Sequence, residues 1–478
     1  MKRIIFSILL LLTPLISNAG GAVNEFTGSA SMSDAVAGIS IVNLSSGEIV
    51  ESYNASLPMV PASVQKLLVT ATALKCYAPE KTFETVTSYC GEINGNTLEG
   101  DLYVTGCGDP TLGSAYGRQQ RNAVLAGMTA ALKAKGIKQI SGRIIADDSG
   151  FSYQGVSPAW LAEDMGNYYA AGSYGINFFD NMYSLNLKTG REGTKPVITG
   201  CNPEIPGINF ANYLTVSGDG KDSAYICGVP FSGYRILSGR VPRNKECYTI
   251  KGDIPDPAMF FAGALKNYLL KNGIEMEAEP VTARVMSLNG ENGCNELKAL
   301  YTHQSDKLSD IITVINHNSN NLYAETLLRW VAQARGKEAS ADEGINAEKE
   351  IWREAGTDLS GTRLYDGSGM SPKNRISAGK LSEILTAAAK DKTLYYTFYS
   401  TLPQTAKDGT VRNFMKGYPT AHKFRLKSGS MEGVQCYAGY YRGKEEYAVV
   451  VMVNNFTAKR SEVQTEIAEL LHKILKDR

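Results

Sequence analysis

The sequence predicts an α+β fold that carries a large, mainly β insertion. From about Cys90 to Cys247 the chain reads as short strands broken by Gly, Asn, Asp and Ser. The second half instead contains long stretches whose apolar residues recur at helical spacing. Near the end, residues 424–426, 434–441 and 446–454 predict successive antiparallel strands before a last helix. A chain of 478 residues with 43% hydrophobic residues has room for two or three domains.

Residues 1–19 have the layout of a secretory signal peptide. Lys2 and Arg3 precede an apolar run that ends at Ile16, and small residues stand just before Gly20. The apolar run is short for a membrane span, so a retained transmembrane anchor is the alternative that we favour less. We therefore expect an exported protein, periplasmic or in the cell envelope, whose association with the membrane is at most peripheral.

The next elements are a predicted hairpin and a predicted helix. Two β-rich runs, 39–42 and 48–53, flank Ser45-Ser46-Gly47, a composition typical of a turn. Pro61 then starts a stretch with apolar residues at helical spacing, which predicts a helix through Leu74. Ser63 is expected in the first turn of that helix.

Helices dominate the prediction for the second half. Asp256-Pro257 and Asn272-Gly273 are the start and stop signals of one helix. The last predicted helix, about 461–475, is amphipathic, and its polar face has charges of mixed sign. We therefore favour packing against the preceding strands over a position on a membrane surface. Three more helices are predicted, over 319–335, 341–355 and 377–390.

Composition and charge exclude several functional classes. The net charge of +1 gives no electrostatic footprint for nucleic acid, and no nucleic-acid partner is predicted. The four histidines and eight cysteines show no zinc-ligand spacing, so neither a metal nor another cofactor is expected. An even number of cysteines permits disulfides in an exported chain without requiring them, and their pairing stays open.

Ser63 and Lys66 form the first candidate catalytic pair. A serine hydroxyl is a weak nucleophile until a base takes its proton, and no histidine stands nearby in the sequence. Residues three apart on a helix share a face, so Lys66 can reach the Ser63 hydroxyl. Lys66 can act as a base only if its pKa falls, which burial and a second cation nearby would achieve. Because the spacing also arises by chance, the alternative is a helix start with a surface lysine.

Ser319-Asn320-Asn321 is the second motif, at the head of a predicted helix. The Ser319 hydroxyl would pass a proton to the leaving amine of the substrate. The Asn321 amide would orient Lys66 and the substrate backbone through hydrogen bonds. A serine that only caps the helix is the alternative.

The third motif is Lys427-Ser428-Gly429, followed by Ser430, in a predicted strand. Lys427 and the Ser428 hydroxyl would hold the terminal carboxylate of the substrate, and Gly429 would let the ligand approach the strand closely. The backbone N–H groups of Ser430 and Ser63 would form the oxyanion hole.

A rival for the third motif, Lys188-Thr189-Gly190, is rejected. It follows Ser184 and Asn186 so closely that the two groups could not occupy opposite walls of one cleft, and no strand pair is expected to continue from it. A β-turn in the insertion is predicted for it instead.

With its three motifs in this order, the sequence resembles the D-alanyl-D-alanine carboxypeptidase and endopeptidase family, the class C penicillin-binding proteins of low molecular mass. The resemblance covers nearly the whole chain after residue 19. Ser428 stands where this family usually has Thr, and Asn320 where Asp is common; the first change keeps the hydroxyl. Outside the motifs, the similar stretches are 59–68, 106–112, 142–149, 321–325, 366–371, 408–410 and 433–440.

The resemblance implies a penicillin-binding transpeptidase or β-lactamase-like domain, an antiparallel sheet between helices, built from residues 22–88 and 297–478. Residues 89–296 would form the inserted region, expected to be two small domains. It also implies that Ser63 attacks D-Ala-D-Ala bonds of peptidoglycan stem peptides, as a carboxypeptidase, an endopeptidase or both, and that an acyl-enzyme forms. β-Lactam antibiotics would be covalent inhibitors at the same serine.

Two other functions stay open from the sequence. A β-lactamase or esterase of the same Ser-Lys type would need fast deacylation of a penicillin adduct. A non-catalytic peptidoglycan-binding protein would keep the fold for docking alone, but the intact Ser63, Lys66 and Ser319 argue against it.

Overall fold

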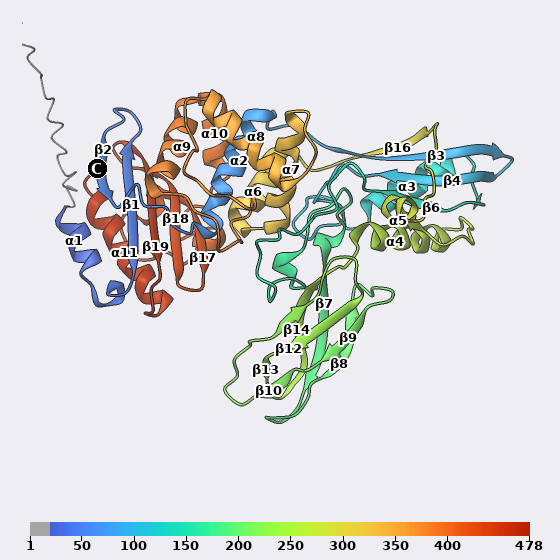
Figure 1. Ribbon diagram of the computed structural model, residues 1–478, viewed down its shortest axis with the longest axis horizontal. Coiled ribbons are helices and arrows are strands. Elements are labelled where there is room, and N and C mark those ends of the chain that lie inside the picture. The colour runs from blue at the N-terminus through green and yellow to red at the C-terminus, as the bar shows by residue number, and fades with distance from the viewer. Residues whose placement is uncertain (1–19) are drawn as a thin grey trace, which may run out of the picture.

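A five-stranded antiparallel sheet, built from both ends of the chain, forms the lobe at the left of Figure 1. The computed structural model describes residues 20–478, so the predicted signal peptide lies outside the described residues. The strand order is β17-β18-β19-β1-β2. Strand β1 pairs with β19 from Val36 opposite Asn454 to Asn43 opposite Tyr447, which joins the two chain ends. The strands are β1 Val36–Asn43, β2 Ile49–Tyr53, β17 Phe424–Met431, β18 Val434–Arg442 and β19 Glu446–Asn454.

Side chains of β19 alternate between two cores, one on each face of the sheet. Val449 and Val451 lie in the core with α1 and α11, whereas Val450 and Met452 lie in the core with α2 and α6 to α10. Helices therefore cover both faces, which fits an α+β fold. The helices of this lobe are α1 Gly21–Thr27, α2 Lys66–Cys76, α6 Leu308–Asn318, α7 Asn321–Ala334, α8 Ala341–Glu354, α9 Ala378–Lys390, α10 Lys392–Ser400 and α11 Arg460–Leu475.

The first part of the insertion is a six-stranded sheet with helices packed against it, at the right end of Figure 1. Its core unites Leu102 of β4 with Met128 of α3 and Phe261 of α4. A disulfide between Cys90 and Cys294 ties β3 to the segment before β16. The elements are β3 Glu84–Asn94, β4 Thr97–Thr105, β5 Gln139–Ile140, β6 Ile144–Asp147, β15 Val281–Thr282, β16 Lys298–Gln304, α3 Ala123–Ala134, α4 Pro257–Lys271 and α5 Ala283–Leu288.

The second part of the insertion is all β and forms the lower lobe of Figure 1. Three small sheets enclose a core around Leu185, Leu187 and Leu237. Strand β7 lies between β14 and β8 in one sheet, and β12 lies between β11 and β9 in another. The strands are β7 Met182–Thr189, β8 Val197–Asn202, β9 Asn209–Asn212, β10 Thr215–Ser217, β11 Tyr225–Cys227, β12 Tyr234–Ser238, β13 Arg240–Pro242 and β14 Lys245–Asp253.

Most of the predicted elements agree with the structure. The hairpin β1–β2 is confirmed, and helices α4, α7, α8, α9 and α11 begin and end close to the predicted residues. Val463, Ile467 and Leu471 of α11 lie in the core beneath the sheet, which confirms packing rather than exposure. Helices α1, α3, α5, α6 and α10 are absent from the sequence prediction. Strand β17 extends well past residue 426, through polar residues that a hydrophobicity pattern does not mark as strand.

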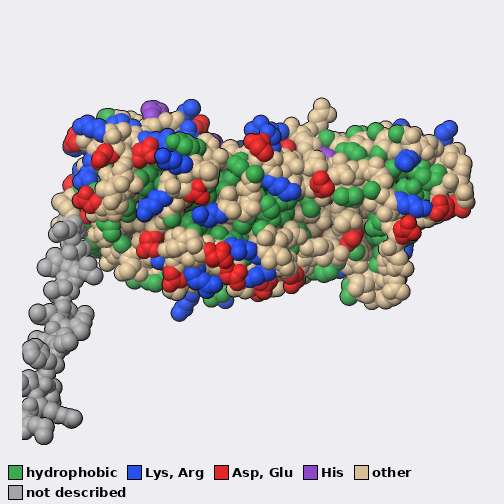
Figure 2. All heavy atoms as spheres, turned by 90° about the horizontal axis from the view of Figure 1, so that it is seen from above, with side chains coloured by type: hydrophobic (Ala, Val, Ile, Leu, Met, Phe, Trp, Pro, Cys, Tyr) green, Lys and Arg blue, Asp and Glu red, His purple; other side chains and the backbone are tan. Residues whose placement is uncertain are grey.

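The described residues contain no membrane-spanning helix, and the face displayed in Figure 2 carries charges of both signs. Within residues 20–478, no helix has the length and apolar character needed to cross a bilayer. Figure 2 shows positive and negative side chains interspersed over the face that it displays, in keeping with the net charge of +1.

Candidate active site

Ser63 lies in a short 3₁₀ turn, Ala62–Gln65, that leads directly into α2. The turn starts with an unusual backbone, because Ala62 has a φ of 47°, in the left-handed region that few residues other than glycine adopt. Val64 and Leu67 are completely buried on either side of Lys66 and anchor the turn in the core. Ser63 and Lys66 are thereby fixed relative to each other.

Lys66 is completely buried, and its ammonium donates to three oxygens. The distances from Nζ are 2.9 Å to Ser63 Oγ, 2.7 Å to Asn321 Oδ1 and 2.5 Å to Ser368 O. Burial lowers the pKa of Lys66 to about 7, against the opposing effect of the carboxylates of Asp366 and Glu325. Burial is the largest cause of this lowered pKa, and the surface-lysine alternative is wrong because Lys66 is completely buried.

Ser319 occupies the junction between α6 and α7. It has a φ of 57°, the left-handed conformation that ends α6. The next residue, Asn320, is the true N-cap of α7, since its side chain accepts a hydrogen bond from the Tyr323 backbone N–H at 3.1 Å. The capping-serine alternative for Ser319 is therefore wrong, and its hydroxyl is available for another partner.

That partner is Lys427 on the edge strand β17. Lys427 Nζ donates to Ser319 Oγ at 2.9 Å and to Ser428 O at 2.6 Å. Burial, with Lys66 as a second cause, holds the pKa of Lys427 well below its usual value. Lys427 is fully buried, so its ammonium lies behind the wall of the site.

Gly429 brings β17 close to the Ser63 turn. A Cβ at this position would lie 2.7 Å from Pro61 O, 2.8 Å from Val64 N and 2.9 Å from Ser63 N. Any side chain would push the strand away from the turn. The structure thus shows a close approach between two segments of the protein at Gly429.

The predicted site residues converge on one cavity of about 600 Å³. Ser63, Ser319 and Asn321 line it on one side, and Ser428 and Ser430 line it from β17. Ser428 Oγ donates to Thr410 Oγ1 at 2.7 Å. The cavity therefore offers a nucleophile, a buried amine beside it and a row of hydroxyl groups, which is an arrangement suited to acyl transfer.

Comparison with known proteins decides the family. The model of the D-Ala-D-Ala carboxypeptidase 3 (S13) family matches residues 20–474. The chain belongs to this family. S13 is a family of serine peptidases, so the chain is a serine D,D-peptidase by family.

Individual relatives agree with this family. The chain is 25% identical to the D-alanyl-D-alanine carboxypeptidase of Actinomadura sp. (strain R39), over 93% of this chain and 83% of that protein. It is also 25% identical to D-alanyl-D-alanine carboxypeptidase DacB of Haemophilus influenzae, over 90% of this chain and 87% of that protein. The crystal structure of penicillin binding protein 4 (dacB) from Haemophilus influenzae matches with a TM-score of 0.81 and 23% identity, over 93% of this chain and 96% of that one. The predicted fold class is confirmed.

The insertion of this S13-family chain supplies one wall of the cavity, which the sequence did not reveal. Leu161, Asp164, Tyr168 and Tyr169 line it together with the motif residues. Asn321 Nδ2 donates to Tyr169 O at 2.7 Å, so the amide orients Lys66 with its oxygen and holds the insertion with its nitrogen. The available signal was the aromatic-rich composition that begins at Tyr168.

A second missed element of the S13 site is the loop 366–371. Its Ser368 carbonyl is one of the three acceptors of Lys66, and its Gly369 and Met370 line the cavity. Thr410, the partner of Ser428, was missed as well. Both segments belong to the stretches that carry the family resemblance, and that was the only signal for them in the sequence.

The rejected motif Lys188-Thr189-Gly190 lies elsewhere in this S13 peptidase. Lys188 and Thr189 end β7, and Lys188 forms an ion pair with Glu246 at 2.8 Å. The prediction of a turn without a strand pair is wrong, because β7 pairs with both β8 and β14. Its sheet is separate from the one that carries β17.

Proposed function

We propose that the protein is an exported serine D,D-peptidase that hydrolyses D-Ala-D-Ala bonds of peptidoglycan stem peptides through an acyl-enzyme on Ser63. One observation carries the proposal: Lys66 Nζ lies 2.9 Å from Ser63 Oγ, and burial lowers the pKa of Lys66 to about 7. A substantial fraction of Lys66 is then neutral at neutral pH and can accept the hydroxyl proton.

Acylation begins when Ser63 Oγ attacks the carbonyl carbon of the penultimate D-Ala. Lys66 takes the hydroxyl proton as the new C–O bond forms. The carbonyl oxygen becomes negative and accepts hydrogen bonds from the backbone N–H groups of Ser63 and Ser430, the proposed oxyanion hole. The close packing of β17 on the Ser63 turn at Gly429 supports this pairing of donors.

Ser319 is the proposed proton donor to the leaving amine. Because Lys427 Nζ donates to Ser319 Oγ, the hydroxyl hydrogen of Ser319 is free to point into the cavity. Its donation lets the C–N bond break and D-alanine leave. The proton that Lys66 took from Ser63 then passes to Ser319, so that Ser319 is a hydroxyl and Lys66 a neutral amine again. Water then attacks the acyl-enzyme, with Lys66 as base again, and Ser63 is released.

The substrate carboxylate is proposed to bind at the Ser428 hydroxyl, with Thr410 beside it. Both hydroxyl groups line the cavity, and Lys427, when protonated, contributes a positive charge from behind the wall. β-Lactams are proposed to acylate the same serine as covalent inhibitors, since the penicillin binding protein 4 of Haemophilus influenzae has been solved in complex with a β-lactam.

We also propose that the protein is exported, and we propose a division of the chain into a catalytic domain and an inserted region. A disulfide between Cys90 and Cys294 suits an oxidising compartment such as the periplasm or the cell envelope, and residues 1–19 have the sequence of a signal peptide. Strand β3 pairs with both β4 and β16, so we propose to assign β3 and β16 to the inserted region. The catalytic domain then consists of the chain before Glu84 and after Gln304.

A peptide assay tests the activity. The mature protein should release D-alanine from a stem pentapeptide that ends in D-Ala-D-Ala, and should leave the same peptide ending in L-Ala-L-Ala intact. Replacing Ser63 with Ala should abolish the release while thermal unfolding stays close to wild type. Undiminished release by Ser63→Ala would refute the proposed nucleophile.

A further inference from the structure

We propose that Glu325 is a positioning residue for the reaction: it fixes the Ser368 carbonyl that, together with Asn321, aims the Lys66 amine at Ser63. The inference rests on the proposed function, because it concerns the same base and the same nucleophile. It assigns a task to a buried carboxylate that lies outside the three motifs.

Helix α7 contacts Lys66 directly through Asn321 and indirectly through Glu325. Residues four apart lie on one face of a helix, so Asn321, Glu325 and Arg329 form a row along α7. Asn321 Oδ1 accepts directly from Lys66 Nζ at 2.7 Å. One turn further along, Glu325 contacts the loop 366–371, which contacts Lys66 from another side.

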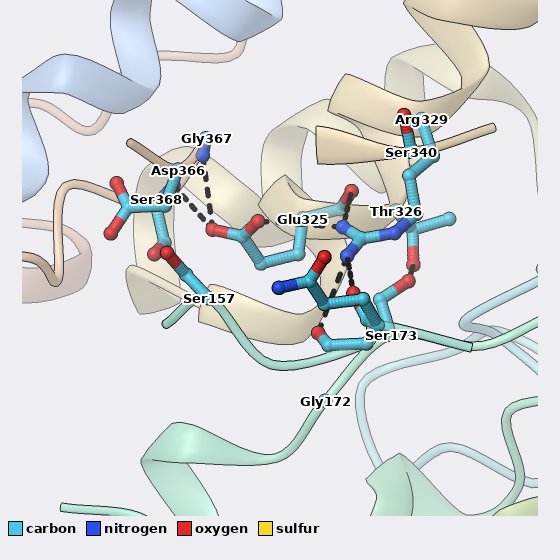
Figure 3. A network of polar contacts seen from close by, with 12 residues as sticks. Ser157, Gly172, Ser173, Glu325, Thr326, Arg329, Ser340, Asp366, Gly367 and Ser368 are labelled. Carbon is cyan, nitrogen blue, oxygen red and sulfur yellow. Dashed lines mark hydrogen bonds and ion pairs between the residues drawn. The ribbon is translucent and has the colours of Figure 1, made fainter. Parts of the chain in front are cut away.

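Glu325 contacts the loop through two hydrogen bonds from backbone N–H groups. Glu325 Oε1 accepts the backbone N–H groups of Gly367 at 3.0 Å and Ser368 at 2.8 Å. The same Ser368 accepts from Lys66 Nζ through its carbonyl at 2.5 Å. Figure 3 shows the Glu325 carboxylate pointing at the Gly367 and Ser368 segment. Glu325 is 1% exposed, so water is poorly placed to replace these bonds.

The geometry matters because a neutral amine has two N–H donors and one lone pair. Asn321 Oδ1 and Ser368 O are the two acceptors that can take both N–H groups. The lone pair then faces Ser63 Oγ, as proton transfer requires. If the Ser368 carbonyl moves, the Lys66 amine can rotate, and its lone pair no longer points at Ser63 Oγ.

Glu325 is itself held in place by Arg329, which is almost completely buried. Arg329 Nη1 lies 3.5 Å from Glu325 Oε2, and its Nη2 donates to Gln154 O at 3.0 Å. Figure 3 places this guanidinium between Glu325 and the segment that contains Ser173. The row on α7 therefore links the base to the inserted region.

The loop also has supports that do not involve Glu325. The Asp366 carboxylate accepts from the backbone N–H of Gly369 at 2.9 Å and of Ser371 at 2.6 Å, and from Trp160 Nε1 at 2.8 Å. A variant without the Glu325 carboxylate should therefore keep a folded loop whose Ser368 carbonyl is less firmly placed.

The charged groups around Lys66 and Glu325 determine how the acylation rate of a Glu325 variant should depend on pH. Lys66 faces the carboxylates of Asp366 and Glu325 and the amine of Lys427. Glu325 faces Arg329, Asp366 and, from α8, Glu348. Burial raises the pKa of Glu325, whereas Arg329 and the hydrogen bond from Ser368 favour its ionised form. Where Glu325 is ionised, its charge favours the protonated form of Lys66, so removing that charge should make Lys66 a base at lower pH.

The test compares Glu325→Ala and Glu325→Gln with wild type in acylation by a fluorescent penicillin between about pH 5 and 9. Glu325→Ala loses the acceptor, and its acylation rate constant should fall about 100-fold, as expected for a displaced catalytic group. Glu325→Gln keeps an amide oxygen that can accept the same two N–H groups. It should therefore retain most of the rate, with the midpoint of the pH profile at lower pH.

Asp109→Asn is the matched control, because Asp109 is an equally buried carboxylate whose hydrogen bonds go to Thr111 in the insertion. It should leave both rate and midpoint unchanged. A wild-type rate in Glu325→Ala, or equal losses in both variants with the wild-type midpoint, would overturn the inference while the proposed function stands. Failure of wild type to acylate at Ser63 would instead remove the proposed function and the inference together.

Discussion

Lys66 is the residue in which burial, hydrogen bonding and charge have to be balanced. An ammonium deep in a protein is costly, and the cost appears as a pKa lowered to about 7. Three acceptors and two nearby carboxylates compensate for part of that cost and keep the amine in one place. Burial thus leaves part of the Lys66 population neutral near pH 7, so that it can accept a proton, while its N–H groups keep their hydrogen-bond partners.

The rate of acylation should follow the titration of Lys66. Since only the neutral amine accepts a proton, the wild-type rate should rise with pH through a midpoint near pH 7. Lys66→Arg keeps a cation that cannot lose its proton, so acylation should fall by about 10²- to 10⁴-fold. Stopped-flow measurement of acylation by a chromogenic cephalosporin checks both the pH profile of wild type and the rate of Lys66→Arg. A flat profile from about pH 5 to 9 would contradict the role of Lys66 as the base.

The sequence predicted which residues form the site better than it predicted their hydrogen-bond partners. Ser63, Ser319, Asn321, Ser428 and Ser430 line one cavity, and Lys66 contacts two of them from the buried side. The third acceptor of Lys66 is a backbone carbonyl, and every residue has one. No pattern of side chains could have marked Ser368 for that contact.

The elements that carry the site are joined by close backbone packing. The turn before α2, the junction of α6 and α7, and the edge strand β17 each supply one motif. Periodicity located α7 and the start of β17, since both contain apolar residues at regular spacing. It could not extend β17 through Lys427 to Ser430, because those polar residues are in the strand through hydrogen bonding to β18.

The Cys90–Cys294 disulfide should stabilise the first inserted unit without affecting chemistry at Ser63. It joins residues 204 positions apart, and replacing both cysteines with serine should cost about 2–4 kcal/mol of unfolding free energy. Urea unfolding with peptide-level hydrogen exchange would locate the loss. Cys247→Ser, at an exposed free cysteine, is the control and should change nothing. Unaltered stability of the double variant would show that the crosslink contributes little.

On the scale of the whole molecule, the active site is assembled from three distant parts of the chain. The two ends build the sheet and its helices, and the middle supplies the wall with Tyr168 and Tyr169. The order of the motifs in the sequence predicted the long insertion between the first and second motif. It carried no information on where the insertion folds back, because that depends on contacts such as Asn321 with Tyr169.

Ser63 should be the nucleophile of this S13-family chain. Mass spectrometry of the mature protein incubated with penicillin, followed by peptide mapping, identifies the residue that is acylated. We predict one adduct per chain, located on Ser63, stable for long enough to map, and absent from Ser63→Ala. A short-lived adduct would favour a β-lactamase. An adduct on another residue, or none on a correctly folded protein, would contradict the account.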